Sequence, residues 1–144
     1  MKTSEIGKAL IKKYEGCRLD AYLCPSKIPT IGYGNTTYED GSKVKIGDKI
    51  TLKRSEELLD NLLPRYEKLV SKNIKVDLNQ NQFDALVSYV WNTGGSSTLY
   101  KLINNKASLN DIKTWWLNKY ITGGGKVLKG LVLRRKEEFD LYIK

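Results

Sequence analysis

The chain has 144 residues, of which 40% are hydrophobic and 28% are charged, and these values fit one globular domain with its own core. They exclude a disordered chain, and the apolar runs are too short to cross a membrane. The formal net charge of +9 indicates an anionic partner, such as nucleic acid, a membrane surface or an acidic wall polymer. With two cysteines and no histidine, we expect no disulfide framework, no metal site and no cofactor.

The first expected elements are a helix and a strand. Residues 4–15 place an apolar side chain at every fourth position, which predicts a helix ending at Gly16. Residues 17–24 then alternate between apolar and polar side chains, which predicts a half-buried strand. This alternation places Cys24 on the polar face and Cys17 on the packed, apolar face. We expect no disulfide between them, because the bond would join opposite faces of the strand.

A second strand is expected at residues 30–37, with Thr30, Gly32 and Gly34 on one face. Two glycines on one face of a strand leave room for close approach by a ligand or by another backbone. A bulge or a bend at a hairpin explains the glycines equally well, and both interpretations stay open. A third short strand is expected at residues 44–46.

The rest of the chain has helical periodicity. A long apolar stripe predicts a helix at 52–72, and Asn79 with Gln82 resembles a capping box that opens the next helix. The glycine-rich stretch 123–126 is interpreted as a mobile loop beside a cleft. The run 134–138, in which basic residues are followed at once by two glutamates, favours a solvated helix face. Further helices are expected at 98–104, 108–118 and 131–143.

These elements indicate a single domain of the α+β class. It consists of a small antiparallel sheet lobe at about 15–50, a connecting helix at about 51–72 and a mostly helical lobe at about 73–144. A long helix that joins two lobes leaves a cleft between them, where we expect the functional residues.

Glu15 stands at the end of the first expected helix, where a carboxylate faces the negative end of the helix macrodipole. Most side chains in such a place point into water. If Glu15 is partly buried in a cleft, however, the dipole and desolvation both favour its protonated form. A carboxylic acid that stays protonated near neutral pH is what general-acid cleavage of a glycosidic bond requires.

The order of these residues resembles the catalytic signature of the phage-type lysozymes, the endolysins that cleave peptidoglycan. In that family a glutamate is followed by eight residues, an aspartate or cysteine, five residues and a threonine. Glu15, Cys24 and Thr30 have this spacing. Two later segments, 81–94 and 123–135, are similar to the central helix and to the C-terminal cleft segment of the family.

The resemblance implies a lysozyme-like fold and a muramidase that hydrolyses the β-1,4 bond between N-acetylmuramic acid and N-acetylglucosamine. It implies Glu15 as the general acid, Cys24 in the second catalytic position and Thr30 as the holder of the attacking water. Trp91 is expected to stack on sugar rings or to belong to the core. Asn35 departs from the family, whose members commonly have histidine there. The expected substrate contacts are Gly32, Gly34, Asn35, Trp91, Asn92 and Thr98.

Two alternatives remain at this point. A lytic transglycosylase shares the lysozyme-like architecture and needs one acidic residue, and the second catalytic position here is a cysteine. Thr30 favours a held water and therefore hydrolysis. A non-catalytic glycan- or DNA-binding domain is supported by the charge, but the chain has no convincing recognition helix for DNA.

The resemblance implies peptidoglycan glycan strands as the partner of a monomer, with no nucleic acid and no stable membrane association. Anionic peptidoglycan explains the positive charge at least as well as nucleic acid does. The N-terminus shows no signal-peptide pattern. We therefore expect the chain in the host bacterial cytoplasm, reaching the cell wall after holin-type release.

Overall fold

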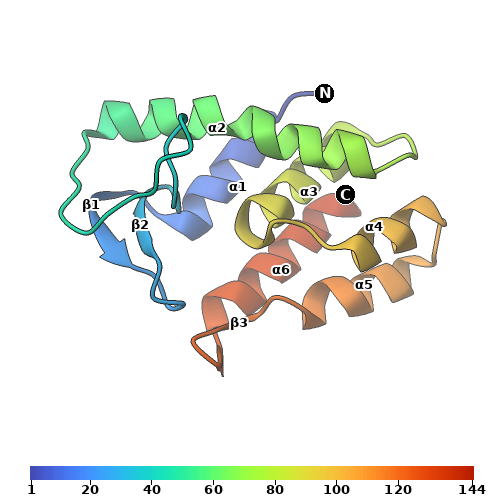
Figure 1. The fold of residues 1–144 in the computed structure, drawn as a ribbon. Coiled ribbons are helices and arrows are strands. Elements are labelled where there is room, and N and C mark those ends of the chain that lie inside the picture. Colours follow the sequence, from blue (N-terminus) through green and yellow to red (C-terminus); the bar gives the residue numbers. More distant parts are fainter.

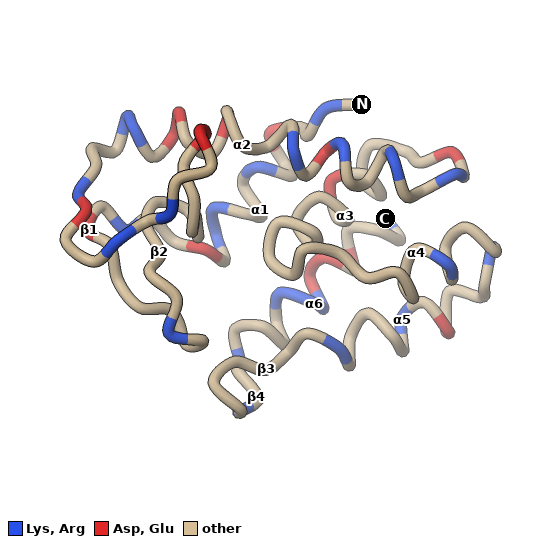
Figure 2. Tube along the Cα trace, viewed as in Figure 1, with Lys and Arg blue, Asp and Glu red and all other residues tan.

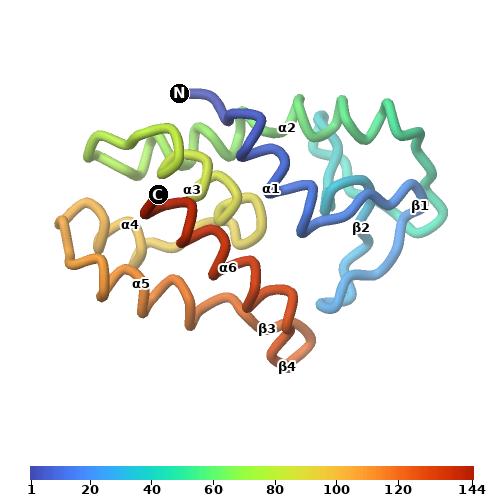
Figure 3. Tube along the Cα trace, turned by 180° about the vertical axis from the view of Figure 1, so that it is seen from behind, coloured from blue at the N-terminus to red at the C-terminus, as the bar shows by residue number.

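The computed structural model describes residues 1–144 as six α-helices and two small antiparallel sheets (Figure 1). The elements in chain order are α1 (Glu5–Glu15), β1 (Arg18–Leu23), β2 (Pro29–Gly32), α2 (Leu52–Asn73), α3 (Gln80–Thr93), α4 (Ser97–Asn104), α5 (Leu109–Asn118), β3 (Thr122–Gly123), β4 (Lys126–Val127) and α6 (Lys129–Tyr142). Helix α2 extends along both parts of the molecule, with the β1–β2 sheet near its start and α3–α6 beside its second half (Figures 1 and 3). This arrangement confirms an α+β fold with a sheet lobe and a helical lobe.

Helix α3 is the centre of the helical lobe. All its residues from Phe83 to Trp91 are buried, including the polar Asp84 and Ser88. Helices α1, α2 and α6 pack around it. A helix buried on all sides is stable only when neighbours cover each side, so α3 determines where the other three helices lie.

Side-chain caps fix where the helices begin. The Asn79 side chain accepts from the Gln82 N–H at 2.8 Å, and the Gln82 side chain accepts from the Asn79 N–H at 2.9 Å, which confirms the capping box of α3. Ser4 caps α1, and its own N–H donates to the buried Asp84 of α3 at 3.0 Å. This contact attaches the start of α1 to the core helix and so holds Glu15, at the other end of α1, in a fixed place.

The β1–β2 sheet packs differently from the sequence-based expectation. Leu19 and Leu23 are 40% and 55% exposed, and Cys17 is exposed rather than packed. The alternation of side chains predicts an apolar face and a polar face for the strand. In this small two-stranded sheet, however, no second layer of structure covers the apolar face. The pairing register also breaks between Arg18 and Tyr22, so the two faces do not continue evenly along β1.

The second strand is shorter than the expected span of residues 30–37. The chain turns back after Gly32, where Ile31 and Asn35 exchange two backbone hydrogen bonds of 2.9 Å. Residues 44–46 form no regular strand, because only isolated bridges connect this part of the chain to its neighbours.

The glycine-rich stretch 123–126 is part of a small hairpin rather than a loop without regular structure. Strands β3 and β4 pair across it, and Gly124 and Gly125 at its tip have φ values of 58° and 80°. L-amino acids with side chains rarely adopt such values, so glycine is the residue that makes this turn without strain. Helix α6 begins directly after the hairpin at Lys129, two residues before the expected start.

The positive charge is distributed over the molecule. Figure 2 shows lysine and arginine along both lobes, with acidic residues between them. Within the structure, no helix has the length and apolar character needed to cross a membrane.

Candidate active site

A cleft of about 450 Å³ lies between the sheet lobe and the helical lobe. Its lining comes from the end of α1, the β1–β2 hairpin, the end of α3 and the β3–β4 hairpin. The expected site residues that line it are Glu15, Cys24, Thr30, Gly34, Trp91 and Asn92, whereas Gly32, Asn35 and Thr98 do not.

Glu15 is the last residue of α1, and only 15% of its side chain is exposed. One carboxylate oxygen lies 3.2 Å from Nη1 of the buried Arg134. Burial raises the pKa of Glu15 above its ordinary value, although the charges of Arg134 and Arg135 oppose the rise. Glu15 therefore keeps its proton to a higher pH than an exposed glutamate does, as a general acid requires.

Gly34 is in direct contact with this carboxyl group. Its φ is 76°, and a Cβ built on it would stand 2.5 Å from Cδ of Glu15. Such a distance is impossible for real atoms, so any side chain here displaces the acid. Both glycines lie where the chain bends after β2, with φ values of 64° and 76°, and within the chain the side chain of Glu15 approaches Gly34 closely.

A buried ionic cluster lies behind Glu15. Glu138 is fully buried, and both Arg134 and Arg135 contact it with 2% or less of their side chains exposed. Nε of Arg135 lies 2.9 Å from one Glu138 oxygen as an ion pair, although its N–H is not aligned for a hydrogen bond. The donors to the Glu138 carboxylate are Ser88 Oγ at 2.6 Å, Arg135 Nη2 at 3.1 Å, and Arg134 Nε and Trp116 Nε1 at 3.2 Å each.

The expectation of a solvated face for residues 134–138 is therefore wrong. Arg134, Arg135 and Glu138 are spaced three and four apart, which places them on one face of α6, and that face is buried against α3 and α5. The spacing was visible in the sequence, but the buried partners Ser88 and Trp116 belong to other helices and gave no local signal.

Thr30 and Cys24 lie on the sheet-lobe side of the cleft. Thr30 is buried, and its hydroxyl donates to the Ile28 carbonyl at 2.8 Å. Its hydrogen is thereby used, so towards the cleft the Thr30 oxygen is an acceptor. Cys24 is partly exposed and free of any disulfide.

Trp91 belongs to the core more than to the cleft. It is 7% exposed, packs on Tyr66 with ring centroids 4.7 Å apart, and donates from Nε1 to the Tyr33 carbonyl at 3.0 Å. Trp91 thereby holds the turn that carries Gly34.

Asn92, the neighbour of Trp91, lines the cleft. Its side chain accepts a hydrogen bond from Arg135 at 2.8 Å, which connects it to the buried cluster.

The remaining expected contacts are placed away from the cleft. Gly32 and Asn35 are buried within the turn that follows β2, and the Asn35 side chain accepts from the Tyr33 N–H at 3.3 Å. Thr98 lines a separate hollow between α4 and α5 together with Trp115. In this conformation neither group of residues reaches the space in front of Glu15.

Two hairpins meet across one side of the cleft. A Cβ at Gly124 would stand 2.9 Å from the Pro25 carbonyl oxygen, and one at Gly123 would stand 3.1 Å from the Pro25 Cβ. Pro25 and Gly123 both line the cleft, and Figures 1 and 3 show the two hairpins side by side. The sequence analysis identified the glycines but not the proline that they contact.

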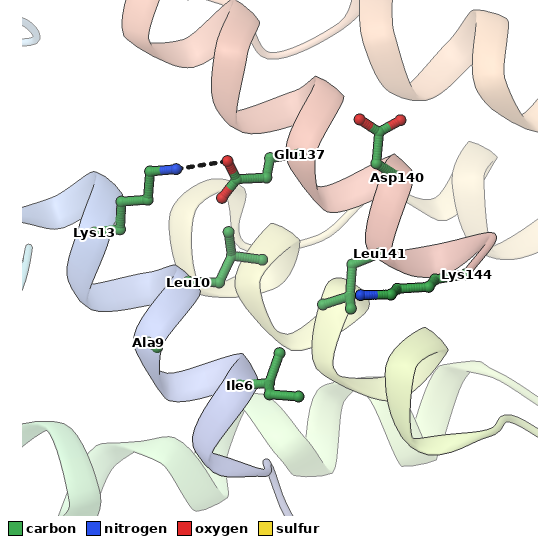
Figure 4. A pocket seen from close by; sticks show the side chains of 8 residues that line it. All are labelled: Ile6, Ala9, Leu10, Lys13, Glu137, Asp140, Leu141 and Lys144. Atoms are coloured by element: carbon green, nitrogen blue, oxygen red, sulfur yellow. Dashed lines mark hydrogen bonds and ion pairs between the residues drawn. The ribbon is translucent and has the colours of Figure 1, made fainter.

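A second hollow lies between α1 and α6, and Figure 4 shows its lining. Lys13 and Glu137 face each other at 2.6 Å across one end of it, and apolar side chains such as Leu10 and Leu141 form its floor. None of the expected site residues belongs to it. No group of three or more metal-ligating side chains is assembled anywhere in the structure.

Comparison with known proteins gives matches along almost the entire chain. Residues 12–138 match the family model described as phage lysozyme. An endolysin of Acyrthosiphon pisum secondary endosymbiont phage 1 is 39% identical, with 99% of this chain and 98% of that protein covered. The solved endolysin of Escherichia coli O157:H7 phage FAHEc1 is 36% identical with a TM-score of 0.81, covering 100% of this chain and 94% of that one. The muramidase domain of SpmX from Asticaccaulis excentricus is 29% identical with a TM-score of 0.80, covering 99% and 98%.

Proposed function

Because the chain belongs to the phage lysozyme family, we propose that it is an endolysin that degrades peptidoglycan with Glu15 as its general acid. The bond cleaved is the β-1,4 bond between N-acetylmuramic acid and N-acetylglucosamine. The observation that carries the proposal is a carboxyl group of raised pKa on the wall of a cleft between two lobes.

The reaction we propose is a hydrolysis with inversion at the anomeric carbon. The carbon–oxygen bond breaks, its electron pair goes to the leaving oxygen, and that oxygen takes the proton of Glu15. A water from the opposite side bonds to the anomeric carbon and releases its surplus proton to the solvent, from which Glu15 is later reprotonated. Atoms and charges balance without any cofactor.

Thr30 supports the second half of this reaction. Its hydroxyl hydrogen is directed to the Ile28 carbonyl, so a water beside it donates to the Thr30 oxygen and is held there. Cys24, in the second catalytic position, is a weaker base than a carboxylate when it is neutral. An oxocarbenium-like transition state needs little nucleophilic push, so a well-placed water compensates for the missing carboxylate.

The partners and the route to the wall follow from the family. We infer that the enzyme acts as a monomer on glycan strands whose peptide carboxylates attract its net charge of +9. It accumulates in the infected bacterium and reaches the wall through a holin-type pore. Nucleic acid and the membrane have no part in this scheme.

Product analysis tests the proposal. Purified cell walls are digested, turbidity is followed, and the fragments are examined by mass spectrometry and for anomeric configuration. Hydrolysis adds the mass of one water and leaves muramic acid reducing ends of inverted configuration. Predominant 1,6-anhydromuramic ends would identify a lytic transglycosylase, and unchanged turbidity with a folded protein would leave a binding domain.

A further inference from the structure

One polar side chain in the cleft has no assigned role. Tyr22 lines the cleft from β1, and it pairs directly with Thr30 of β2 in the antiparallel register. Residues directly opposite each other in an antiparallel pair project to the same face of the sheet. Tyr22 and Thr30 therefore stand side by side, and Cys24 follows Tyr22 at the strand period of two.

The Tyr22 ring is held in place while its hydroxyl is free. The guanidinium carbon of Arg18 lies 4.3 Å from the ring centroid, which fixes the ring by a cation–π contact. No protein group forms a hydrogen bond with the Tyr22 hydroxyl. The hydroxyls of Tyr14, Tyr33 and Tyr38 donate to carboxylates, whereas that of Tyr22, like those of the buried Tyr89 and Tyr100, has no partner within the chain.

The free hydroxyl is a donor over the working range of pH. Burial raises the pKa of Tyr22 above its ordinary value, and the charge of Glu15 adds to the rise while Arg18 opposes it. The phenol thus remains protonated and offers its hydrogen to the cleft.

A water held by Thr30 lacks one partner. In the proposed reaction it donates one hydrogen to the Thr30 oxygen, because the Thr30 hydrogen is bound to Ile28, and its second hydrogen is left to a weak acceptor such as the Cys24 sulfur, which lines the same cleft. Of its two lone pairs, one must attack the anomeric carbon, and the other has no donor from Thr30 because that hydrogen is used by Ile28. A donor on the same face of the sheet completes the arrangement.

We propose that Tyr22 is a further catalytic residue. Its hydroxyl donates a hydrogen bond to one lone pair of the attacking water and so directs the water's other lone pair at the anomeric carbon. Tyr22 forms no covalent bond and keeps its proton throughout. The inference rests on the proposed hydrolysis with Thr30 as the water holder.

The test is Tyr22→Phe, which keeps the ring and the Arg18 contact and removes only the hydroxyl. We expect kcat to fall about ten- to one-hundredfold, because the attacking water is no longer held in the reactive position. KM should stay within about twofold of the wild-type value. Because water attack slows while the C6 hydroxyl of muramic acid remains in reach, the fraction of 1,6-anhydro products should rise. The matched control is Tyr100→Phe, which removes another hydroxyl without a hydrogen-bond partner, on α4 and outside the cleft, and it should change neither value.

A double variant separates this inference from the function on which it rests. Tyr22 and Thr30 act on the same water, so Tyr22→Phe added to Thr30→Val should cost much less than Tyr22→Phe alone. Equal losses in both backgrounds, a loss in KM only, or a kcat within twofold of the wild type would overturn the role of Tyr22. If the wild type itself yields anhydro products, it is instead the proposed hydrolysis that fails.

Discussion

The two walls of the cleft are built in opposite ways. On the helical side, Glu15 contacts Arg134, Arg134 contacts Glu138, and these three side chains are largely or fully buried and joined by ion pairs. On the sheet side, a two-stranded hairpin leaves Leu19 and Leu23 exposed, and its polar side chains keep bonding capacity towards the cleft. The helical wall, which sets the pKa of the acid, is therefore made of buried side chains bonded to one another. The sheet wall, which we propose holds water and sugar, keeps polar groups that are free to bind them.

The helical wall also shows two buried carboxylates with different surroundings. Glu138 has donors from α3, α5 and α6 and two arginines, so its negative charge is fully compensated. Glu15 has one ion pair and a raised pKa. Two carboxylates that contact the same arginine thus differ in role: Glu138 stabilises the fold, whereas the surroundings of Glu15 suit proton transfer.

The largest expected effect is that of Glu15→Gln on activity. Glutamine keeps the shape and the contact with Arg134 but has no proton to transfer, so lysis of cell walls should slow about a thousandfold or more. In the wild type, activity should extend above the ordinary pH range of a glutamate and fall as Glu15 ionises. A folded Glu15→Gln protein that lyses walls at the wild-type rate would contradict the assignment.

The same variant has an opposite effect on stability. Folding raises the pKa of Glu15, so the folded state loses stability as pH rises from the unfolded pKa towards the folded one. Glu15→Gln should therefore increase the free energy of unfolding at neutral pH, by about 1 kcal/mol. The gain should vanish below about pH 4, where both states hold the proton. Denaturant titrations at the two pH values measure it.

Glu138→Gln should cause the largest loss of stability. It removes the acidic partner of the buried Arg135 and leaves Arg134 with Glu15 alone, and loss of such a buried partner typically costs about 3–5 kcal/mol. The matched control is Glu137→Gln one residue earlier, where the glutamate is 39% exposed and pairs with Lys13 at the surface. That change should cost less than about 1 kcal/mol. Similar losses in both variants would show that the buried cluster has no special energetic weight.

Alkylation separates the two cysteines on the sheet side. Both thiols are reachable, so iodoacetamide is applied to Cys17→Ser and Cys24→Ser proteins, each with one remaining thiol. Adding bulk at Cys24, which lines the cleft, should reduce activity about tenfold or more by displacing water and substrate. The adduct at Cys17, which lies outside the cleft beside Ser55 at 3.3 Å, should leave activity within about twofold. A larger loss of activity from the adduct at Cys17 than from that at Cys24 would show that the substrate binds on the Cys17 side of β1.

The smallest effect concerns the attachment of the sheet lobe to α2. Both oxygens of Glu39 accept from Arg54 at 2.6 Å, and this bidentate pair lowers the pKa of Glu39 to about 2. Stability from this pair is present above the unfolded pKa and is lost as pH falls towards 2. Glu39→Gln should cost about 1 kcal/mol at pH 7 and clearly less at pH 2, where Glu39 is partly protonated in the folded state, with activity little changed. An equal cost at both pH values would assign the effect to packing.

The sequence predicted what depends on neighbours along the chain. The capping box of Asn79 and Gln82, the helix ending at Glu15 and the spacing to Cys24 and Thr30 are all local patterns, and the fold and family are confirmed. The site roles of these residues stay predictions. The exposure of Cys17 was missed because alternation says nothing about which layer covers a strand.

Other features depend on contacts between distant segments. The burial of Arg134 and Glu138 results from Ser88 and Trp116, which lie 22 to 50 residues away from their partners. The position of Thr98 follows from the packing of α4 on α5, where it lines a hollow separate from the cleft. The spacing of Arg134, Arg135 and Glu138 is visible in the sequence, but neither their distant partners nor the packing of α4 on α5 leaves a local signal.

The contact between Pro25 and Gly124 bears on how a polymer enters the enzyme. An endolysin cuts glycan strands that are anchored in a continuous sacculus, so a strand has no free end to thread and must enter sideways. Sideways entry on this side passes the place where the two hairpin tips lie close together at Pro25 and Gly124. If separation of the tips limits turnover, intact wall should be cut more slowly than short soluble fragments, which can enter the cleft lengthwise.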